Sequence, residues 1–489
     1  MIAYVMAGLA CAPVVGQQAK ARAVEHRDYL VVGGPLKTAA ADKEIAAALK
    51  QVSTAKIKAN IEALVAFNNR TTISSTDTDL KPGTGVLAAA DWIEAQFKAY
   101  SAACGGCLEV KVDAFVEPPA KESFNSGKPR IIKPTPIRNV YAILRGSDPV
   151  QAKRMYLVTG HYDTRETDVF NTHDFAPGAN DDSSGTAVSL ESARVLSQHK
   201  FPATIVFVAV AGEEQGLNGS HHLAVLAKEQ GWQLEGVLNN DIVGGDTTPG
   251  DKLQDKGRVR VFSQGLLASA PIETIRQVLG VGAENDTAHR ELARAVVDVG
   301  RTYFGGPKKF TPVMETRLDR YLRGGDHKSF SDIGFPAVRL TEWRENYDHQ
   351  HQHVRVENGK EYGDLLKFDD FEYIAQVARL NMAVLATLAK SPGIPQNVRL
   401  VTSNLDNNST IKWDTPTAAG ADVKYQIVWR ETTAGDWQYG VDAAKFGDGK
   451  SATLPVSKDN VFFGVRACDA GWHCSQAVSP LPERRAAAQ

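Results

Sequence analysis

The sequence predicts an α/β fold, in which a mainly parallel mixed sheet is sandwiched by helices, followed by an all-β immunoglobulin-like sandwich. Between about residues 110 and 240, short β-branched apolar segments alternate with segments of helical periodicity, which is typical of a parallel sheet covered by helices. Beyond about residue 395, short apolar segments alternate with turn residues, which is typical of a sandwich. The 489 residues accommodate two or three domains of ordinary size.

Periodicity places the individual elements. Residues 20–75 are expected to be mostly helical, because apolar side chains recur at helical spacing in residues 43–50 and 57–67. The same spacing predicts further helices over residues 88–100, 186–198, 219–228 and 369–388. Strands of the mixed sheet are expected over residues 110–115, 140–144, 155–158, 204–210 and 237–240. Strands of the sandwich are expected over residues 398–401, 409–413, 425–429, 452–454 and 461–467.

The apolar N-terminus and the change in residue pattern near residue 395 suggest the domain boundaries. Residues 1–12 are apolar and about as long as the core of a signal peptide, but no basic segment precedes them, so residues 1–22 are either an incomplete signal or no signal. Residues 23–390 are expected to form the main domain, with 23–55 either a propeptide or a helical extension, and residues 395–482 the sandwich. We expect an exported protein, periplasmic or secreted, of bacterial origin.

Composition limits the partners. The net charge of −2 gives no reason to expect nucleic acid or an acidic membrane, and no segment is long and apolar enough to span a bilayer. Cys104 with Cys107 and Cys468 with Cys474 are close pairs that we expect to form local disulfides, as in an oxidising compartment. The first pair could also be a redox or zinc dithiol, but a second CxxC sequence is lacking.

Metal-binding side chains follow the predicted strands. His161 and Asp163 come after the segment 155–158, and Asp241 after 237–240. The pair Glu213 and Glu214 comes after 204–210, and Asp181 lies in a tight loop just before a predicted helix. Because ligands of parallel sheets collect at the carboxyl ends of the strands, these residues should converge on one crevice. Their chemistry indicates a hydrolase with two metal ions.

The spacing of these residues suggests a division of roles. In an extended segment, His161 and Asp163 lie on the same side, so one can bind metal while the other accepts the ring N–H. Glu213 and Glu214 are adjacent and point differently, so one can bind metal while the other stays free as a base. Asp181 can present its two carboxylate oxygens to two ions.

Several motifs in order identify a family. The segments 161–163, 178–185, 212–220, 240–241 and 326–337 make residues 55–390 resemble the co-catalytic zinc aminopeptidases of the bacterial leucyl aminopeptidase type, whose fold is that of phosphorylase/hydrolase-like zinc peptidases. The resemblance implies two zinc ions and peptide substrates cleaved at the N-terminus. Pro395, Trp413 and Tyr425 make the C-terminal part resemble a fibronectin type III module, which could bind a polymer or a cell surface.

The resemblance also implies a role for each residue. One zinc would be held by His161 and Asp241, and the other by Glu214 and a late histidine, with Asp181 bridging. Glu213 would be the general base and Asp163 would orient His161. A cis peptide bond is implied between Asp181 and Asp182.

The late histidine has three candidates. His349, His351 and His353 occupy alternate positions and would face the same way in an extended segment. His351 best matches the position of the ligand in the family, His349 is the alternative, and His353 is expected at the surface.

Two other functions remain open. The same fold serves glutaminyl cyclases, carboxypeptidases and deacylases, so the reaction can differ although the metal site is kept. The peptidase domain could also be a degenerate, non-catalytic binding protein. A complete set of ligands and base favours the zinc aminopeptidase.

Overall fold

The computed structural model describes residue 30 and residues 32–121, 128–306, 309–416 and 422–483. The possible signal segment, residues 1–22, lies outside the described residues. Among the described helices, none is both long enough and apolar enough to cross a membrane.

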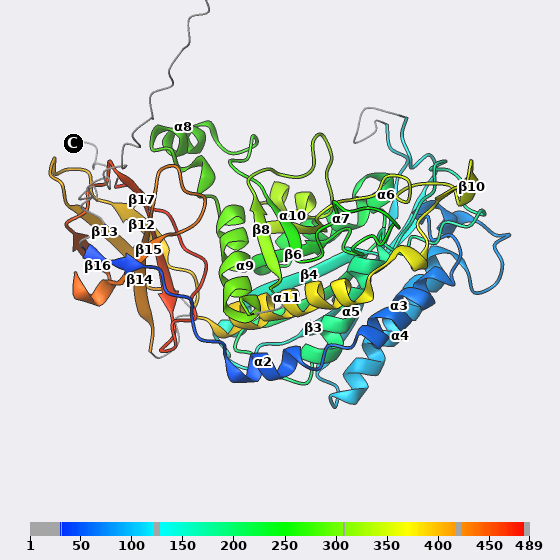
Figure 1. Cartoon of the computed structure of the whole chain (residues 1–489), viewed down its shortest axis with the longest axis horizontal. Helices are drawn as coiled ribbons and strands as arrows, with labels where there is room; N and C mark the ends of the chain where they lie inside the picture. Colours follow the sequence, from blue (N-terminus) through cyan, green and yellow to red (C-terminus); the bar gives the residue numbers. More distant parts are fainter. Residues whose placement is uncertain (1–29, 31, 122–127, 307–308, 417–421, 484–489) are drawn as a thin grey trace, which may run out of the picture.

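The larger, N-terminal part of the structure is built on one large mixed sheet (Figure 1). Within the described residues, this sheet has eight strands in the order β2-β3-β5-β4-β6-β9-β7-β8. The four central strands β5, β4, β6 and β9 run parallel, whereas β2, β3 and the β7–β8 pair join the sheet through antiparallel neighbours. The bounds are β2 Leu108–Glu117, β3 Thr135–Leu144, β4 Arg154–His161, β5 Thr204–Val210, β6 Gln233–Asn240, β7 Arg258–Ser263, β8 Thr311–Glu315 and β9 Ala337–Glu342. The expected α/β class is confirmed.

Helices cover both faces of the sheet, which makes three layers. One face is buried under a large apolar core to which α2, α3, α4, α5, α9 and α11 contribute, with bounds Lys43–Leu49, Thr54–Val65, Gly85–Ala103, Ser183–Leu196, Ala288–Phe304 and Phe371–Lys390. The other face carries a smaller core under α7, Asn218–Glu229, and α10, His327–Ile333. The central strand β5 is buried at all seven positions, as its apolar segment predicted.

The C-terminal part is a separate all-β unit, as expected. Its two sheets, as far as the chain is described, have the orders β1-β15-β14-β17 and β16-β13-β12-β18. The bounds are β12 Gln396–Leu400, β13 Ser409–Asp414, β14 Lys424–Glu431, β15 Tyr439–Asp442, β16 Ser451–Leu454, β17 Val461–Cys468 and β18 Leu481–Pro482. Trp413 and Tyr425 pack in its core, with ring centroids 5.3 Å apart. Both expected disulfides, Cys104–Cys107 and Cys468–Cys474, are present.

The expected helical region before residue 75 is wrong in part. Residues 33–42 are not helical, and Gly34–Pro35 forms β1, which pairs with β15 of the C-terminal sandwich. Gly33, Gly34 and Pro35 account for the difference, because glycine disfavours helix and the residue before a proline is pushed towards an extended conformation. The N-terminal segment therefore pairs with the sandwich before the chain enters the domain of the mixed sheet.

The two domains meet along α9. Arg294 donates from Nε to the carbonyl oxygen of Gly435 at 2.8 Å, and Trp437 donates from Nε1 to Glu291 Oε2 at 3.0 Å. Arg430 of β14 forms an ion pair of 2.6 Å with Asp286. Glu291 is buried at this interface, and burial raises its pKa to about 7, although the positive charge of Arg294 opposes the shift. A buried charge network thus joins the domains.

The raised pKa of Glu291 predicts a pH-dependent stability. The ordinary pKa of the group is 4.5, so the folded protein holds a proton that the unfolded chain releases between pH 4.5 and about 7. The stability that this group contributes is present below pH 4.5 and is lost as the pH rises through 7. Relative to Glu291→Gln, the wild type should lose about 1–3 kcal/mol of unfolding free energy across this range.

Urea unfolding of both proteins between pH 4.5 and 8 measures that difference. Glu273→Gln on α8, Ile272–Gly280, is the matched control, because the Glu273 side chain is 71% exposed. The control should follow the wild type at every pH. A free-energy difference between wild type and Glu291→Gln that stays constant with pH would contradict the prediction.

Candidate metal centre

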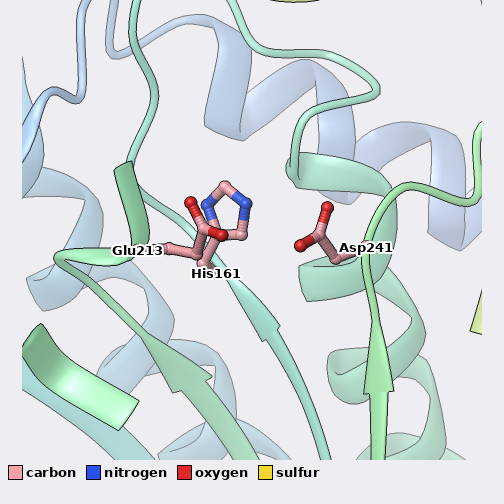
Figure 2. Close-up of side chains that lie close together, drawn as sticks. All are labelled: His161, Glu213 and Asp241. Atoms are coloured by element: carbon pink, nitrogen blue, oxygen red, sulfur yellow. The ribbon is translucent and has the colours of Figure 1, made fainter. Parts of the chain in front are cut away.

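The predicted ligands lie at the carboxyl ends of the central parallel strands. His161 is the last residue of β4, and Asp241 directly follows β6. Glu213 and Glu214 are the first residues of α6, Glu213–Gly216, which begins three residues after the end of β5. Figure 2 shows His161, Glu213 and Asp241 turned towards one another from three different elements. The strand ends therefore converge as the sequence indicated.

The described residues form two groups that can each hold a metal ion. The first contains His161, Glu213 and Asp241, and the second contains Asp181, Glu214 and His351; within each group the ligand atoms lie within 4.8 Å of one another. All five expected ligands are thus brought together. Glu213, expected to be free of metal, lies as close to His161 and Asp241 as a ligand would.

Asp181 connects the two groups. Its Oδ1 lies 3.2 Å from Nε2 of His161, and its Oδ2 lies 2.9 Å from Nε2 of His351. The same nitrogen of His351 lies 2.9 Å from Oε1 of Glu214. The two oxygens of one carboxylate therefore face the imidazoles of both groups, which is the arrangement of a bridging ligand. The implied cis peptide bond between Asp181 and Asp182 is present.

The donor set suits zinc. Each group offers one imidazole nitrogen and carboxylate oxygens, which are common zinc ligands. Oε1 of Glu214 is buried, and its close neighbour, Nε2 of His351 at 2.9 Å, is the imidazole of the same group. Four carboxylates, those of Asp181, Glu213, Glu214 and Asp241, gather in this small volume, and such a concentration of negative charge is costly without cations.

Burial and neighbouring charges act differently on the carboxyl groups. Burial raises the pKa of Glu213 well above its ordinary value, and the negative charges of Asp241 and Glu214 add to the shift. Burial has the same effect in Asp181, but the charges and hydrogen bonds of His351 and His161 outweigh it and hold its pKa well below the ordinary value. Of these two carboxyl groups, Glu213 therefore holds a proton more strongly than Asp181.

Asp163 lies behind His161, where it was expected. Nδ1 of His161 is 3.1 Å from the main-chain oxygen of Asp163 and 3.4 Å from its Oδ1. The other oxygen, Oδ2, accepts from Thr72 at 2.9 Å and from the main-chain N–H of Glu214 at 3.3 Å. Asp163 therefore fixes the His161 ring and the start of α6 together.

The three late histidines have different surroundings. His351 reaches the site, whereas His349 pairs through Nδ1 with Asp246 and stacks on Phe368 with ring centroids 3.6 Å apart. His353 pairs with Glu166 at 2.8 Å and is 47% exposed. The preference for His351 agrees with this geometry.

Two buried charged residues that support the ligands were not predicted. Arg339 of β9 donates to Oδ1 of Asp241 at 2.8 Å. Asp364 accepts the main-chain N–H groups of Asn180 and Asp181, at 2.8 and 2.7 Å, and so holds the loop of the bridging residue. An arginine inside the apolar segment 337–340 was the available signal for the first; the second stands in a loop without any pattern.

Comparison with known proteins identifies the family. The profile of peptidase family M28 matches residues 139–359. A "probable zinc metalloprotease" of Leptosphaeria maculans is 42% identical, over 91% of this chain and 98% of that protein. The chain belongs to peptidase family M28. A second "probable zinc metalloprotease", of Pyricularia oryzae, is 43% identical to this M28 peptidase, over 92% of this chain and 87% of the relative.

Two solved structures are similar to this chain in part. The LapA aminopeptidase of Legionella pneumophila aligns with a TM-score of 0.48 and 19% identity, over 76% of this chain and 79% of LapA. The glutaminyl cyclase of Porphyromonas gingivalis aligns with a TM-score of 0.45 and 18% identity, over 68% of this chain and 98% of the cyclase. The M28 peptidase is an enzyme, a zinc metalloprotease by family.

Proposed function

We propose that this M28 peptidase is an aminopeptidase with two zinc ions, which removes N-terminal residues from peptides. The observation that carries the proposal is the position of Asp181, whose two oxygens face His161 and His351. A single-metal site would need only one of these groups. The site also opens into a cavity of about 470 Å³, a size typical of small-ligand sites, which suits the end of a peptide.

The proposed ligands divide between the two ions. His161 and Asp241 would hold one ion, Glu214 and His351 would hold the other, and Asp181, which faces both imidazoles, would contribute to both. When bound, the ions would acidify a water and polarise the scissile carbonyl.

The chain itself supplies the proton transfer. The Glu213 carboxylate accepts a proton from the attacking water and returns it to the leaving amine. Asp163 keeps the His161 ring oriented, through contacts of 3.1 and 3.4 Å to Nδ1. Arg339 keeps Asp241 in place through its bond to Oδ1.

Zinc titration of the metal-free protein tests this proposal. Hydrolysis of leucyl- and alanyl-nitroanilide should rise with added zinc and reach its maximum at two ions per chain. Binding of one zinc, with no release of nitroaniline, would overturn the proposal and favour a cyclase or another reaction of this fold. The cyclase alternative is tested in parallel with a peptide that begins with glutamine, by following release of ammonia.

We also propose that the protein is exported. The disulfides Cys104–Cys107 and Cys468–Cys474 support this, because such bonds persist in oxidising compartments. The fibronectin type III character of residues 395–482 is proposed as well, supported by the two packed sheets and by Trp413 and Tyr425 in their core. Binding of a polymer or a cell surface by this module stays a prediction.

A further inference from the structure

The wall of the active-site cavity is basic. Among the described residues that line it are four arginines, Arg130, Arg165, Arg320 and Arg323. Two of them pair with acids outside the metal centre: Arg320 with Asp319 at 3.0 Å and with Glu345, and Arg323 with Glu345 at 3.3 Å.

Arg165 has no acid of its own in the described part of the chain. Its ion pair is with Oε2 of Glu214, at the long distance of 3.7 Å, and Glu214 is a proposed zinc ligand. Its Nε is buried and lacks a hydrogen-bond partner among the described residues. A buried guanidinium N–H without an acceptor is costly, so this group is ready for an incoming oxygen.

Arg130 stands next to Arg165 with the same charge. Its guanidinium donates to the main-chain oxygen of Glu214, which leaves the carboxylate of that residue to the metal site. Burial lowers the pKa of Arg130, and the positive charge of Arg165 lowers it further. Two guanidinium groups that repel each other at one wall form a natural site for an anion.

The charge of the metal centre makes the cavity more basic when zinc is bound. The carboxylates of Asp181, Glu213, Glu214 and Asp241 line the same cavity, with a formal charge equal and opposite to that of two zinc ions. Zinc would therefore cancel the acids that lie nearest Arg165 and Arg130. Their positive charge would then face the substrate without compensation.

The cavity offers little to an aliphatic side chain. Among the described lining residues, the large apolar or aromatic ones are Leu217 and Tyr347, and Tyr347 is 61% exposed. An apolar pocket gains its selectivity from buried area, which is scarce here. The cavity can therefore select between substrates mainly by their charge.

We propose that Arg165 and Arg130 bind a carboxylate of the peptide next to the scissile bond. The inference rests on the proposed function, because it names the substrate class of the same site. The carboxylate can belong to an acidic side chain on either side of the bond, or to the C-terminus of a dipeptide. A charge-assisted contact with a guanidinium group supplies the selectivity.

Three matched substrate pairs distinguish the sources of the carboxylate. Glutamyl- against glutaminyl-nitroanilide tests the side chain before the bond, and alanyl-glutamate amide against alanyl-glutamine amide tests the side chain after it. Alanyl-alanine against its amide tests the C-terminal carboxylate. In at least one pair, the zinc-loaded wild type should cleave the charged member with a kcat/KM about tenfold or more above that of the neutral one.

Substitution of Arg165 tests the assignment of the residue. In Arg165→Gln, the charged-to-neutral ratio of kcat/KM should fall by about tenfold, and a uniform loss of activity cancels in this ratio. Arg276→Gln, which alters an exposed ion pair on α8, is the matched control and should keep the wild-type ratio. Calorimetry measures the same effect as binding, with the charged and neutral members of each pair titrated into zinc-loaded Glu213→Gln. The charged member should bind with the lower Kd, and this difference in Kd should shrink when Arg165→Gln is added.

The outcomes separate this inference from the proposed function. Hydrolysis of neutral peptides, with every charged-to-neutral ratio within about twofold of unity, would overturn the inference and leave the aminopeptidase intact. A ratio that survives in Arg165→Gln would also overturn it. If no peptide is hydrolysed, the proposed function fails, and calorimetry alone decides whether Arg165 binds a carboxylate.

Discussion

Glu213→Gln should abolish most of the peptidase activity and leave the zinc content unchanged. A positioned general base contributes about 10²- to 10⁴-fold to such a reaction, so kcat/KM should fall by that factor. Gln keeps the size of Glu and one oxygen, but it cannot take a proton from water. The measurements are nitroanilide hydrolysis and metal analysis of the dialysed protein, which should still hold two zinc ions per chain.

The metal content of Glu213→Gln distinguishes a general base from a metal ligand. Glu213 lies within ligand distance of His161 and Asp241, so geometry alone permits a role as ligand. Loss of one zinc from Glu213→Gln would contradict the role of base and make Glu213 a ligand. Glu273→Gln, at an exposed position on α8, should keep both its zinc and its activity.

His351→Ala should remove one zinc ion and most of the activity. The imidazole of His351 is the nitrogen donor of its group, 2.9 Å from both Asp181 and Glu214. Loss of residues that merely orient a ligand weakens metal binding by about 10- to 100-fold, so loss of a ligand should exceed that range. Zinc affinity is measured by competition with a chelator, and activity with alanyl-nitroanilide.

His353→Ala is the matched control for His351→Ala. His353 lies two positions away, pairs with Glu166 and is half exposed, so its loss should leave zinc affinity within about twofold of the wild type. Zinc loss in His353→Ala, together with retention in His351→Ala, would reverse the assignment of the ligand.

The sequence was sufficient for the centre of the fold. The segment 155–158 is apolar throughout, and 204–210 is apolar apart from Thr204, because β4 and β5 are covered on both faces. A strand with one face in water would alternate apolar and polar residues. Polar residues directly after such strands must lie at one edge of the sheet. His161, Glu214 and Asp241 were therefore predictable as neighbours although they are far apart in sequence.

The periphery could not be predicted in the same way. Arg258–Ser263 alternates charged and apolar residues, and Thr311–Glu315 begins with a threonine and a proline, so neither resembles a buried parallel strand. Both are strands because they extend the sheet beyond β9. The residues that support Asp181 and Asp241 were also unpredictable from local pattern. Asp364 and Arg339 contact them from positions far away in the sequence, and such contacts leave no periodic signal.

The two-residue strand β1 ties the N-terminal segment to the C-terminal sandwich. Gly34 and Pro35 pair with Gly440 and Tyr439, and the N–H of Leu36 donates to the main-chain oxygen of Gln438 at 2.8 Å. The chain therefore contributes a strand to the C-terminal sandwich before it forms the peptidase domain. A single cleavage near residue 393 would not set the sandwich free. Truncation there would also strip β1 of its partner.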